Sequence, residues 1–336
     1  MALTSHLNNA ASPIGQFIKQ RFSQTNALTR DANRQLKNAS TLRPVIQTGE
    51  QYPYAYLGTA IDYRIRYAFA ITPYQQLVAW RGALKLMTKP WESDDDIPFD
   101  WESLPEGVSI PLSVGASGDP FAVAQGPYPL KLVQAFFDNL DTTLQALQPV
   151  GKLLEPVAEH MVDRYCMVLS FFEQVYRTNA YMQGSLIQPT VKQSVEELLA
   201  IPQNAWLDDM EAMFSLFYDR HQDLLSHPHV LNPAFAGSSD VGGADADFIV
   251  DGCLIDMKAT ISSQIRADFL YQLAGYLLLD YNDAYHITSV GIYMVRQGLL
   301  LKWDVSTFLQ KLTGDDHVSL RALRQAFQTI CQRNRE

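Results

Sequence analysis

The spacing of hydrophobic residues divides the chain into a long helical part and a mixed last third. Apolar residues alternate irregularly with Lys, Arg and Gln over 11–40, which predicts short helices, and helical spacing returns from Gly58 to about Met87 with a break at Pro73. Residues 130–225 repeat apolar positions every three or four residues and therefore predict long helices. Residues 88–129 hold seven prolines and several glycines, which favours an irregular connection.

The pattern changes after His227-Pro228-His229. Short β-like runs follow at 248–250 (FIV) and 253–255 (CLI), and then a helix is expected from about Ala267 to Asp283. Two strands (SVGIYMV and LLLKWDV) flank a turn at Gln297-Gly298, and the last segment, 319–335, predicts an amphipathic helix. This order of elements indicates an α/β fold with a mixed sheet.

The dipeptide Asp251-Gly252 predicts a tight β-hairpin. A two-residue type I′ turn requires positive φ at both central positions, which Asp and Gly tolerate. Counting outward from that turn pairs Val250 with Cys253 and continues until Asp247 opposes Asp256. Because side chains alternate between the faces of a strand, the same count places four charged groups on one face. These are Asp245, Asp247, Asp256 and Lys258.

Two carboxylates opposed across a ladder repel each other, and a divalent cation between them would remove the conflict. Hard oxygen ligands of this kind suit Mg²⁺ or Mn²⁺. A lysine beside the pair can orient the attacking water, or neutralise charge that develops on a phosphoryl oxygen. The hairpin therefore predicts a metal site suited to phosphate chemistry.

This stretch resembles the D…(D/E)-x-K signature of the PD-(D/E)XK nuclease superfamily. Asp247 takes the position of the first acid, Asp256 that of the second, and Lys258 that of the lysine, with hydrophobic flanks that match the family's central strands. The resemblance implies a restriction-endonuclease-like core, a mixed central sheet flanked by helices. It also implies a metal bound by Asp247, Asp256 and the backbone carbonyl of Met257, with Asp245 as a second-metal ligand or merely the end of a strand.

Two further features resemble the RecB-like branch of that family. Gln272-Leu-Ala-Gly-Tyr276 matches its Q-x-x-x-Y element, and residues four apart share a helical face, so both side chains are expected on the substrate side of the site. Upstream, Gly58-Thr-Ala-Ile-Asp62 resembles the branch's first core helix, with Asp62 where a histidine often stands. Asp62 is therefore a candidate for an additional metal ligand.

The resemblance implies a single nuclease domain over 1–336. Its core elements would lie at about 50–87 and 235–310, separated by the irregular acidic segment 88–129 and a large helical insertion at about 130–225. No Walker A motif or helicase signature accompanies the site.

Composition modifies this interpretation in two ways. The net charge of −10 argues against a nucleic-acid partner, but seven acids without a basic residue lie within 92–106, which leaves about −3 elsewhere. Three widely spaced cysteines exclude a sequence-local zinc knuckle and fit a reducing compartment. With no signal peptide and no apolar run long enough to span a bilayer, we expect a cytoplasmic protein that does not enter membranes.

The sequence therefore predicts a Mg²⁺- or Mn²⁺-dependent deoxyribonuclease, with DNA as its substrate and prokaryotic or phage DNA metabolism as its setting. The alternative is a catalytically inactive module of the same fold that binds nucleic acid or a partner protein of a repair, recombination or defence complex. DNA against RNA, strandedness, endo- against exonuclease action, sequence specificity and oligomeric state are left open.

Overall fold

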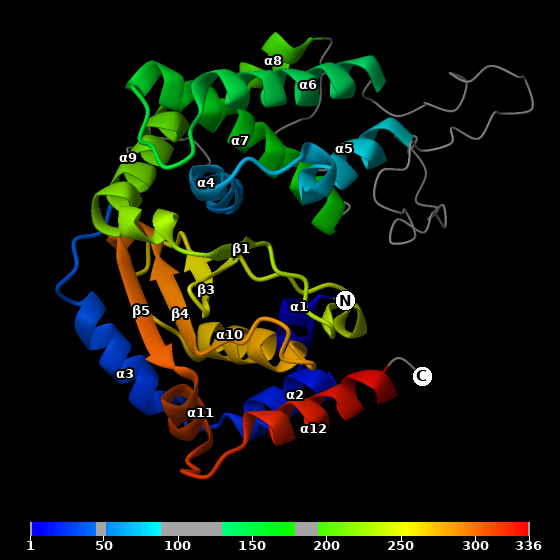
Figure 1. Ribbon diagram of the computed structural model, residues 1–336, viewed down its shortest axis with the longest axis vertical. Helices are drawn as coiled ribbons and strands as arrows, with labels where there is room; N and C mark the ends of the chain where they lie inside the picture. Colours follow the sequence, from blue (N-terminus) through cyan, green and yellow to red (C-terminus); the bar gives the residue numbers. More distant parts are fainter. Residues whose placement is uncertain (1, 45–51, 89–129, 179–193, 335–336) are drawn as a thin grey trace, which may run out of the picture. The chain divides into compact units, whose positions relative to one another are not determined.

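The computed structural model describes residues 2–44, 52–88, 130–178 and 194–334. They divide into two compact units (Figure 1). The sheet unit comprises 1–43 and 215–336, and the helical unit comprises 44–214. The predicted acidic segment lies almost wholly outside the described residues. The predicted core element at 50–87 belongs to the helical unit and the one at 235–310 to the sheet unit, and a single nuclease domain that joins them stays a prediction.

A five-stranded mixed sheet forms the centre of the sheet unit, in the order β1-β2-β3-β4-β5. Its strands are β1 (His229–Leu231), β2 (Phe248–Val250), β3 (Cys253–Lys258), β4 (Ser289–Met294) and β5 (Leu299–Asp304). Only β3 and β4 run parallel among these strands, and the other neighbours are antiparallel. The predicted α/β class and four of the strands are confirmed. The strand β1, which begins directly after Pro228, was not predicted.

Helices cover one face of this sheet and enclose the hydrophobic core (Figure 1). They are α1 (Leu3–Asn8), α2 (Pro13–Arg21), α3 (Thr25–Leu36), α10 (Ala267–Leu279), α11 (Val305–Thr313) and α12 (Leu320–Arg333). Helix α10 is buried on most of its surface because it is apolar nearly all round. Serine side chains cap α2 and α12: Ser12 accepts from the amide of Gly15, and Ser319 from that of Ala322.

The short 3-10 turn η5 (Val295–Gln297) joins β4 to β5 and is fixed by two distant segments of the sheet unit. The amide of Leu42 donates to the carbonyl of Arg296 at 2.8 Å. Near the end of α9 (Asn204–His221), Arg220 donates to the carbonyl of Gln297 at 2.9 Å. Gly298, which follows η5, has φ +56°, and a Cβ there would lie 2.6 Å from Leu216 Cγ, so only glycine fits this turn.

The helical unit consists of the helices predicted from the apolar spacing. They are α4 (Tyr54–Phe69), η1 (Tyr74–Gln76), α5 (Val78–Thr88), α6 (Leu130–Leu147), α7 (Pro156–Thr178), α8 (Val195–Leu199) and α9 (Asn204–His221), whose residues from Ser215 belong to the sheet unit. The predicted break at Pro73 is confirmed. Gly82 allows α5 and α7 to approach closely, because a Cβ there would lie 1.7 Å from the carbonyl oxygen of Phe172.

The remaining described elements are two 3-10 turns, η3 (Gln222–Ser226) and η4 (Ser238–Val241). None of the helices in the described ranges is long and apolar enough to cross a membrane.

Candidate functional site

The hairpin that carries the predicted motif forms as its turn chemistry dictates. Asp251 has φ +49° and Gly252 has φ +69°, the positive values that a type I′ turn needs. The register pairs Val250 with Cys253 and continues to the pair Phe248–Ile255. The predicted register is therefore confirmed over the three pairs of the ladder.

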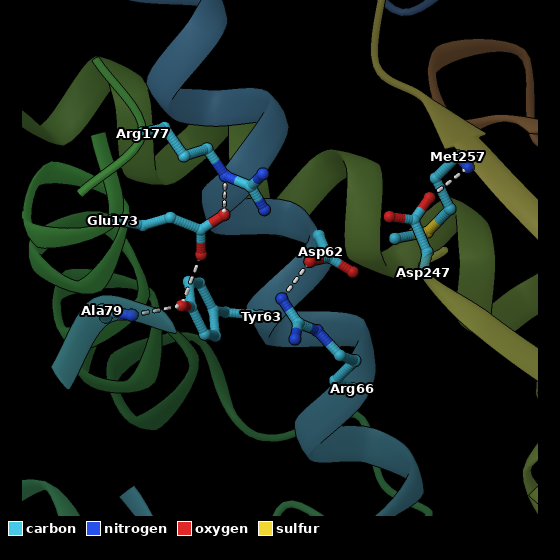
Figure 2. Close-up of polar contacts among 8 residues, drawn as sticks. All are labelled: Asp62, Tyr63, Arg66, Ala79, Glu173, Arg177, Asp247 and Met257. Atoms are coloured by element: carbon cyan, nitrogen blue, oxygen red, sulfur yellow. Dashed lines mark hydrogen bonds and ion pairs between the residues drawn. The ribbon is translucent and has the colours of Figure 1, made fainter. Parts of the chain in front are cut away.

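The ladder stops one pair before the acids. Asp247 precedes β2, and its carboxylate Oδ2 accepts a hydrogen bond of 2.5 Å from the backbone amide of Met257 on β3 (Figure 2). The ladder therefore ends before the expected pair of Asp247 with Asp256, and the next bond to β3 comes from a side chain where backbone pairing was expected. This geometry keeps the two carboxylates at one end of the hairpin without a strand pair between them.

Asp245 continues the pairing of β2 with β1. In the described sheet it forms an isolated antiparallel bridge with Ala234, on the side of β2 that pairs with β1. This bridge lies on the β1 side, so the expected position of Asp245 opposite Lys258 stays a prediction. The backbone-carbonyl ligand expected at Met257 lies on β3 between Asp256 and Lys258.

Asp256 and Lys258 form a close ion pair on the face of β3 that α10 covers. Lys258 Nζ lies 2.6 Å from Asp256 Oδ2, and the side chains are 16% and 4% exposed. Despite this contact, Asp256 Oδ2 accepts no hydrogen bond of regular geometry from a described residue. The Lys258 ammonium group compensates the charge of this buried oxygen, and a carboxylate oxygen with two lone pairs keeps capacity for a further donor or cation.

Gln272 and Tyr276 lie on one face of α10, as predicted from their spacing, and reach the lysine. Lys258 Nζ donates to Gln272 Oε1 at 2.9 Å, and Gln272 Nε2 donates to the hydroxyl of Tyr276 at 2.7 Å. Tyr276 is buried and stacks on Phe235 with 6.1 Å between ring centroids. The two motif residues therefore hold Lys258 from the side of α10. The expected position on the substrate side did not include this role.

Asp62 lies on α4 in the helical unit. Its Oδ2 accepts from Arg66 Nη2 (Figure 2), while its Oδ1 is buried without a hydrogen-bond partner among the described residues. The pKa of Asp62 is raised to about 6. Burial is the main cause, Arg66 opposes the rise, and the nearby charge of Glu173 adds to it. The additional metal ligand predicted at this position stays a prediction.

Next to Asp62 lies a hydrogen-bonded network that the sequence did not reveal. The Tyr63 hydroxyl donates to Glu173 Oε2 at 2.6 Å and accepts from the amide of Ala79 at 3.2 Å (Figure 2). Arg177 Nε donates to Glu173 Oε1 at 2.6 Å. Burial raises the pKa of Tyr63 well above its usual value, so the phenol stays protonated and ties α4, α5 and α7 together.

The groups available to bind the predicted metal are the oxygen donors of the hairpin. Within the described ranges, no group of three or more His, Cys, Asp or Glu side chains is arranged to hold a metal ion. The hairpin offers two carboxylates and a backbone carbonyl, all hard oxygen donors, and one carboxylate oxygen has unused acceptor capacity. Such a set fits an ion like Mg²⁺ that keeps several waters.

Comparison with known proteins adds no relative: the chain matches no protein-family model, no curated protein and no solved structure. The resemblance to PD-(D/E)XK nucleases therefore depends on the motif residues and on their arrangement at one end of the hairpin.

Proposed function

We propose that this protein is a metal-dependent deoxyribonuclease with a PD-(D/E)XK core, hydrolysing phosphodiester bonds at the end of the β2–β3 hairpin. One observation carries the proposal. Asp256 and Lys258 share a face of β3 in a 2.6 Å contact, and Asp247 is joined to the intervening Met257 amide, so the three motif groups meet at one end of the hairpin.

Asp247, Asp256 and the carbonyl of Met257 would hold the metal ion. When bound, Mg²⁺ or Mn²⁺ supplies Lewis-acid stabilisation of the phosphoryl oxygens and lowers the pKa of water. The protein's own part is electrostatic. Asp256 is nearly buried, so its charge acts in surroundings of low polarity, where it interacts more strongly than at the surface.

Lys258 would stabilise the negative charge that develops on the phosphate. Its ammonium group is held by Asp256 and Gln272, and Tyr276 holds Gln272 in turn. A charge fixed in this way needs little reorganisation during the reaction, which is the source of most electrostatic catalysis. Gln272 and Tyr276 are positioning residues in this proposal.

A second candidate is the catalytically inactive module that binds nucleic acid or a partner protein. It is favoured by the internal bonding of the motif: Lys258 is already engaged by Asp256 and Gln272, and Asp247 by the Met257 amide. The excess of 36 acidic over 26 basic residues also favours a protein partner.

Incubation of the full chain with labelled single- and double-stranded DNA, in Mg²⁺, Mn²⁺ or EDTA, tests the proposal. We expect metal-dependent cleavage that Lys258→Ala lowers by about a hundredfold or more, the size of effect seen when a preorganised charge-stabilising group is removed. Lys302→Ala is the matched control, because Lys302 is an exposed lysine of the same sheet. Cleavage that survives Lys258→Ala would reject this site, and DNA binding without cleavage in any metal would favour the inactive module.

A further inference from the structure

The loop of residues 259–266, which joins β3 to α10, starts directly after Lys258 and is anchored at its first residue. Arg296 Nε donates to the carbonyl of Ala259 at 3.0 Å. Arg296 is completely buried, and its own carbonyl accepts from the amide of Leu42. A buried guanidinium is thus used to fix the backbone next to Lys258.

The middle and the end of the loop are anchored as well. Buried Gln297 donates from Nε2 to Ser263 Oγ at 3.3 Å. Asn33 on α3 forms two hydrogen bonds with the backbone of Ile265. Its Nδ2 donates to the carbonyl at 3.1 Å, and its Oδ1 accepts from the amide at 2.6 Å. Three separate anchors over eight residues hold the loop in one conformation, so ordering it on binding would cost little entropy.

Three of the four side chains that this fixed loop exposes carry polar groups suited to a sugar-phosphate backbone. The exposed ones are Ile261, Ser262, Gln264 and Arg266. Hydroxyl, amide and guanidinium groups make most contacts to the phosphates and sugars of DNA.

Arg266 is held beside the lysine of the candidate site by one aromatic ring. The Phe269 centroid lies 4.9 Å from Arg266 Cζ and 5.2 Å from Lys258 Nζ, both within the range of a cation–π contact. Asp268 accepts from Arg266 Nε at 3.1 Å and also from Nη2. The Arg266 side chain is nevertheless 64% exposed and does not cap α10, although Arg266 occupies the N-cap position.

We propose that the 259–266 loop binds the phosphodiester backbone of DNA beside the reacting phosphate, with Arg266 as a phosphate contact. This inference rests on the proposed nuclease function. Arg266 is the charged side chain that the loop presents to solvent, and a planar guanidinium donates to phosphate through several N–H groups at once. Phe269 and Asp268 fix its orientation, while Arg296, Gln297 and Asn33 position the loop.

Binding of a labelled DNA duplex to the full chain, measured by fluorescence anisotropy in EDTA over a range of salt, tests this inference separately from cleavage. We expect Arg266→Gln to weaken binding about tenfold on every sequence, as loss of a charged hydrogen bond predicts. The slope of log K against log salt should fall by about 0.9, the value for one lost phosphate contact on duplex DNA. Arg321→Gln, which removes an exposed arginine of α12, is the control and should change neither.

The outcomes distinguish failure of the loop proposal from failure of the nuclease proposal. A weaker affinity and smaller slope for Arg266→Gln alone supports the loop even if no condition gives cleavage. Unchanged binding by Arg266→Gln overturns the loop proposal while leaving cleavage to be judged by Lys258→Ala. Failure of the wild-type chain to bind DNA at low salt also overturns it. Asn33→Ala should increase hydrogen exchange of the loop amides and weaken binding without changing the salt slope.

Discussion

Two ion pairs, one in each unit, each join a basic side chain to a carboxylate but differ in how completely they are enclosed. In the helical unit, Arg64 and Glu159 have no exposed side-chain surface, and both oxygens of Glu159 are bonded. In the sheet unit, Lys258 remains 16% exposed, and Asp256 Oδ2 accepts no regular hydrogen bond from the described residues. The Arg64–Glu159 pair is therefore closed to solvent, whereas the Lys258–Asp256 pair is open, because water still reaches its lysine.

The environment of Arg64 explains why its pair is structural. Arg64 Nε and Nη2 both donate to Glu159, the amide of Leu154 donates to Glu159 Oε2 at 3.2 Å, and Phe214 lies 3.5 Å from Arg64 Cζ. Burial raises the pKa of neighbouring Asp163 well above its usual value, and the charge of Glu159 raises it further. The raised pKa favours a neutral Asp163, so this neighbour adds no third charge beside Arg64 and Glu159.

The largest effect on stability should come from breaking the closed pair of Arg64 and Glu159. Glu159→Gln leaves Arg64 buried and uncompensated, so we expect it to lower the free energy of unfolding by about 3–5 kcal/mol, measured by urea denaturation. Asp208→Asn, at a side chain that is 68% exposed, is the control and should change stability by less than about 0.5 kcal/mol. A small loss for Glu159→Gln would mean that the helical unit tolerates an unpaired Arg64, and the contrast between the pairs would fail.

Breaking the open pair of Lys258 and Asp256 should show the reverse, a large loss of cleavage with a small loss of stability. Asp256→Asn removes a carboxylate from the proposed metal site, so we expect cleavage to fall by about a hundredfold or more, a loss typical for preorganised charges. Its cost in unfolding free energy should stay below about 1 kcal/mol, because Lys258 keeps Gln272 and partial exposure to water. Both quantities come from one purified variant. A stability loss as large as that of Glu159→Gln would assign Asp256 a structural role.

The pair of Asp62 and Arg66 is an intermediate case and gives the smallest effect. The pKa of Asp62 is raised from 3.8 to about 6, so the folded protein binds more protons than the unfolded chain between these values. The stability that protonated Asp62 contributes is present below pH 3.8 and is lost as pH rises through 6. The free energy of unfolding of wild type relative to Asp62→Asn should therefore fall over that interval, on the order of 1 kcal/mol.

Urea denaturation of both proteins at several pH values between 3.5 and 7 (on the order of half-unit steps) measures this difference. Arg66 must be kept in both, because its charge opposes the shift. Parallel stability curves for the two proteins would show that folding leaves the pKa of Asp62 unchanged.

Local chemistry made part of this molecule predictable from sequence. The Asp251-Gly252 turn fixes its own register, and residues four apart on α10 share a face whatever surrounds them. The strand β1 has only three residues and follows a proline, so it carries little pattern of its own, and it forms by pairing with β2. Contacts such as Arg296 to Ala259 join residues 37 positions apart and leave no local signal.

The same limit applied to the candidate site. The motif predicted which groups gather there, but not that the Asp247 side chain bonds the Met257 amide, because backbone pairing was the simpler continuation of the hairpin. A turn sequence such as Val295-Arg296-Gln297-Gly298 likewise reads as exposed and polar. In the folded protein Arg296 and Gln297 are buried, since tertiary partners satisfy their polar groups.

The turn η5 also has a consequence for the modular construction of the chain. The backbone leaves the sheet unit just after Leu42 and re-enters it at Ser215, and both ends contact residues 296–298. Both breaks in the chain of the sheet unit therefore lie at the same turn, and the 171-residue helical unit is inserted between them. Replacing 44–214 with a short flexible peptide would close only a small loop, and loop closure of that size costs little entropy. The sheet unit thus has the connectivity of a domain into which a second domain is inserted.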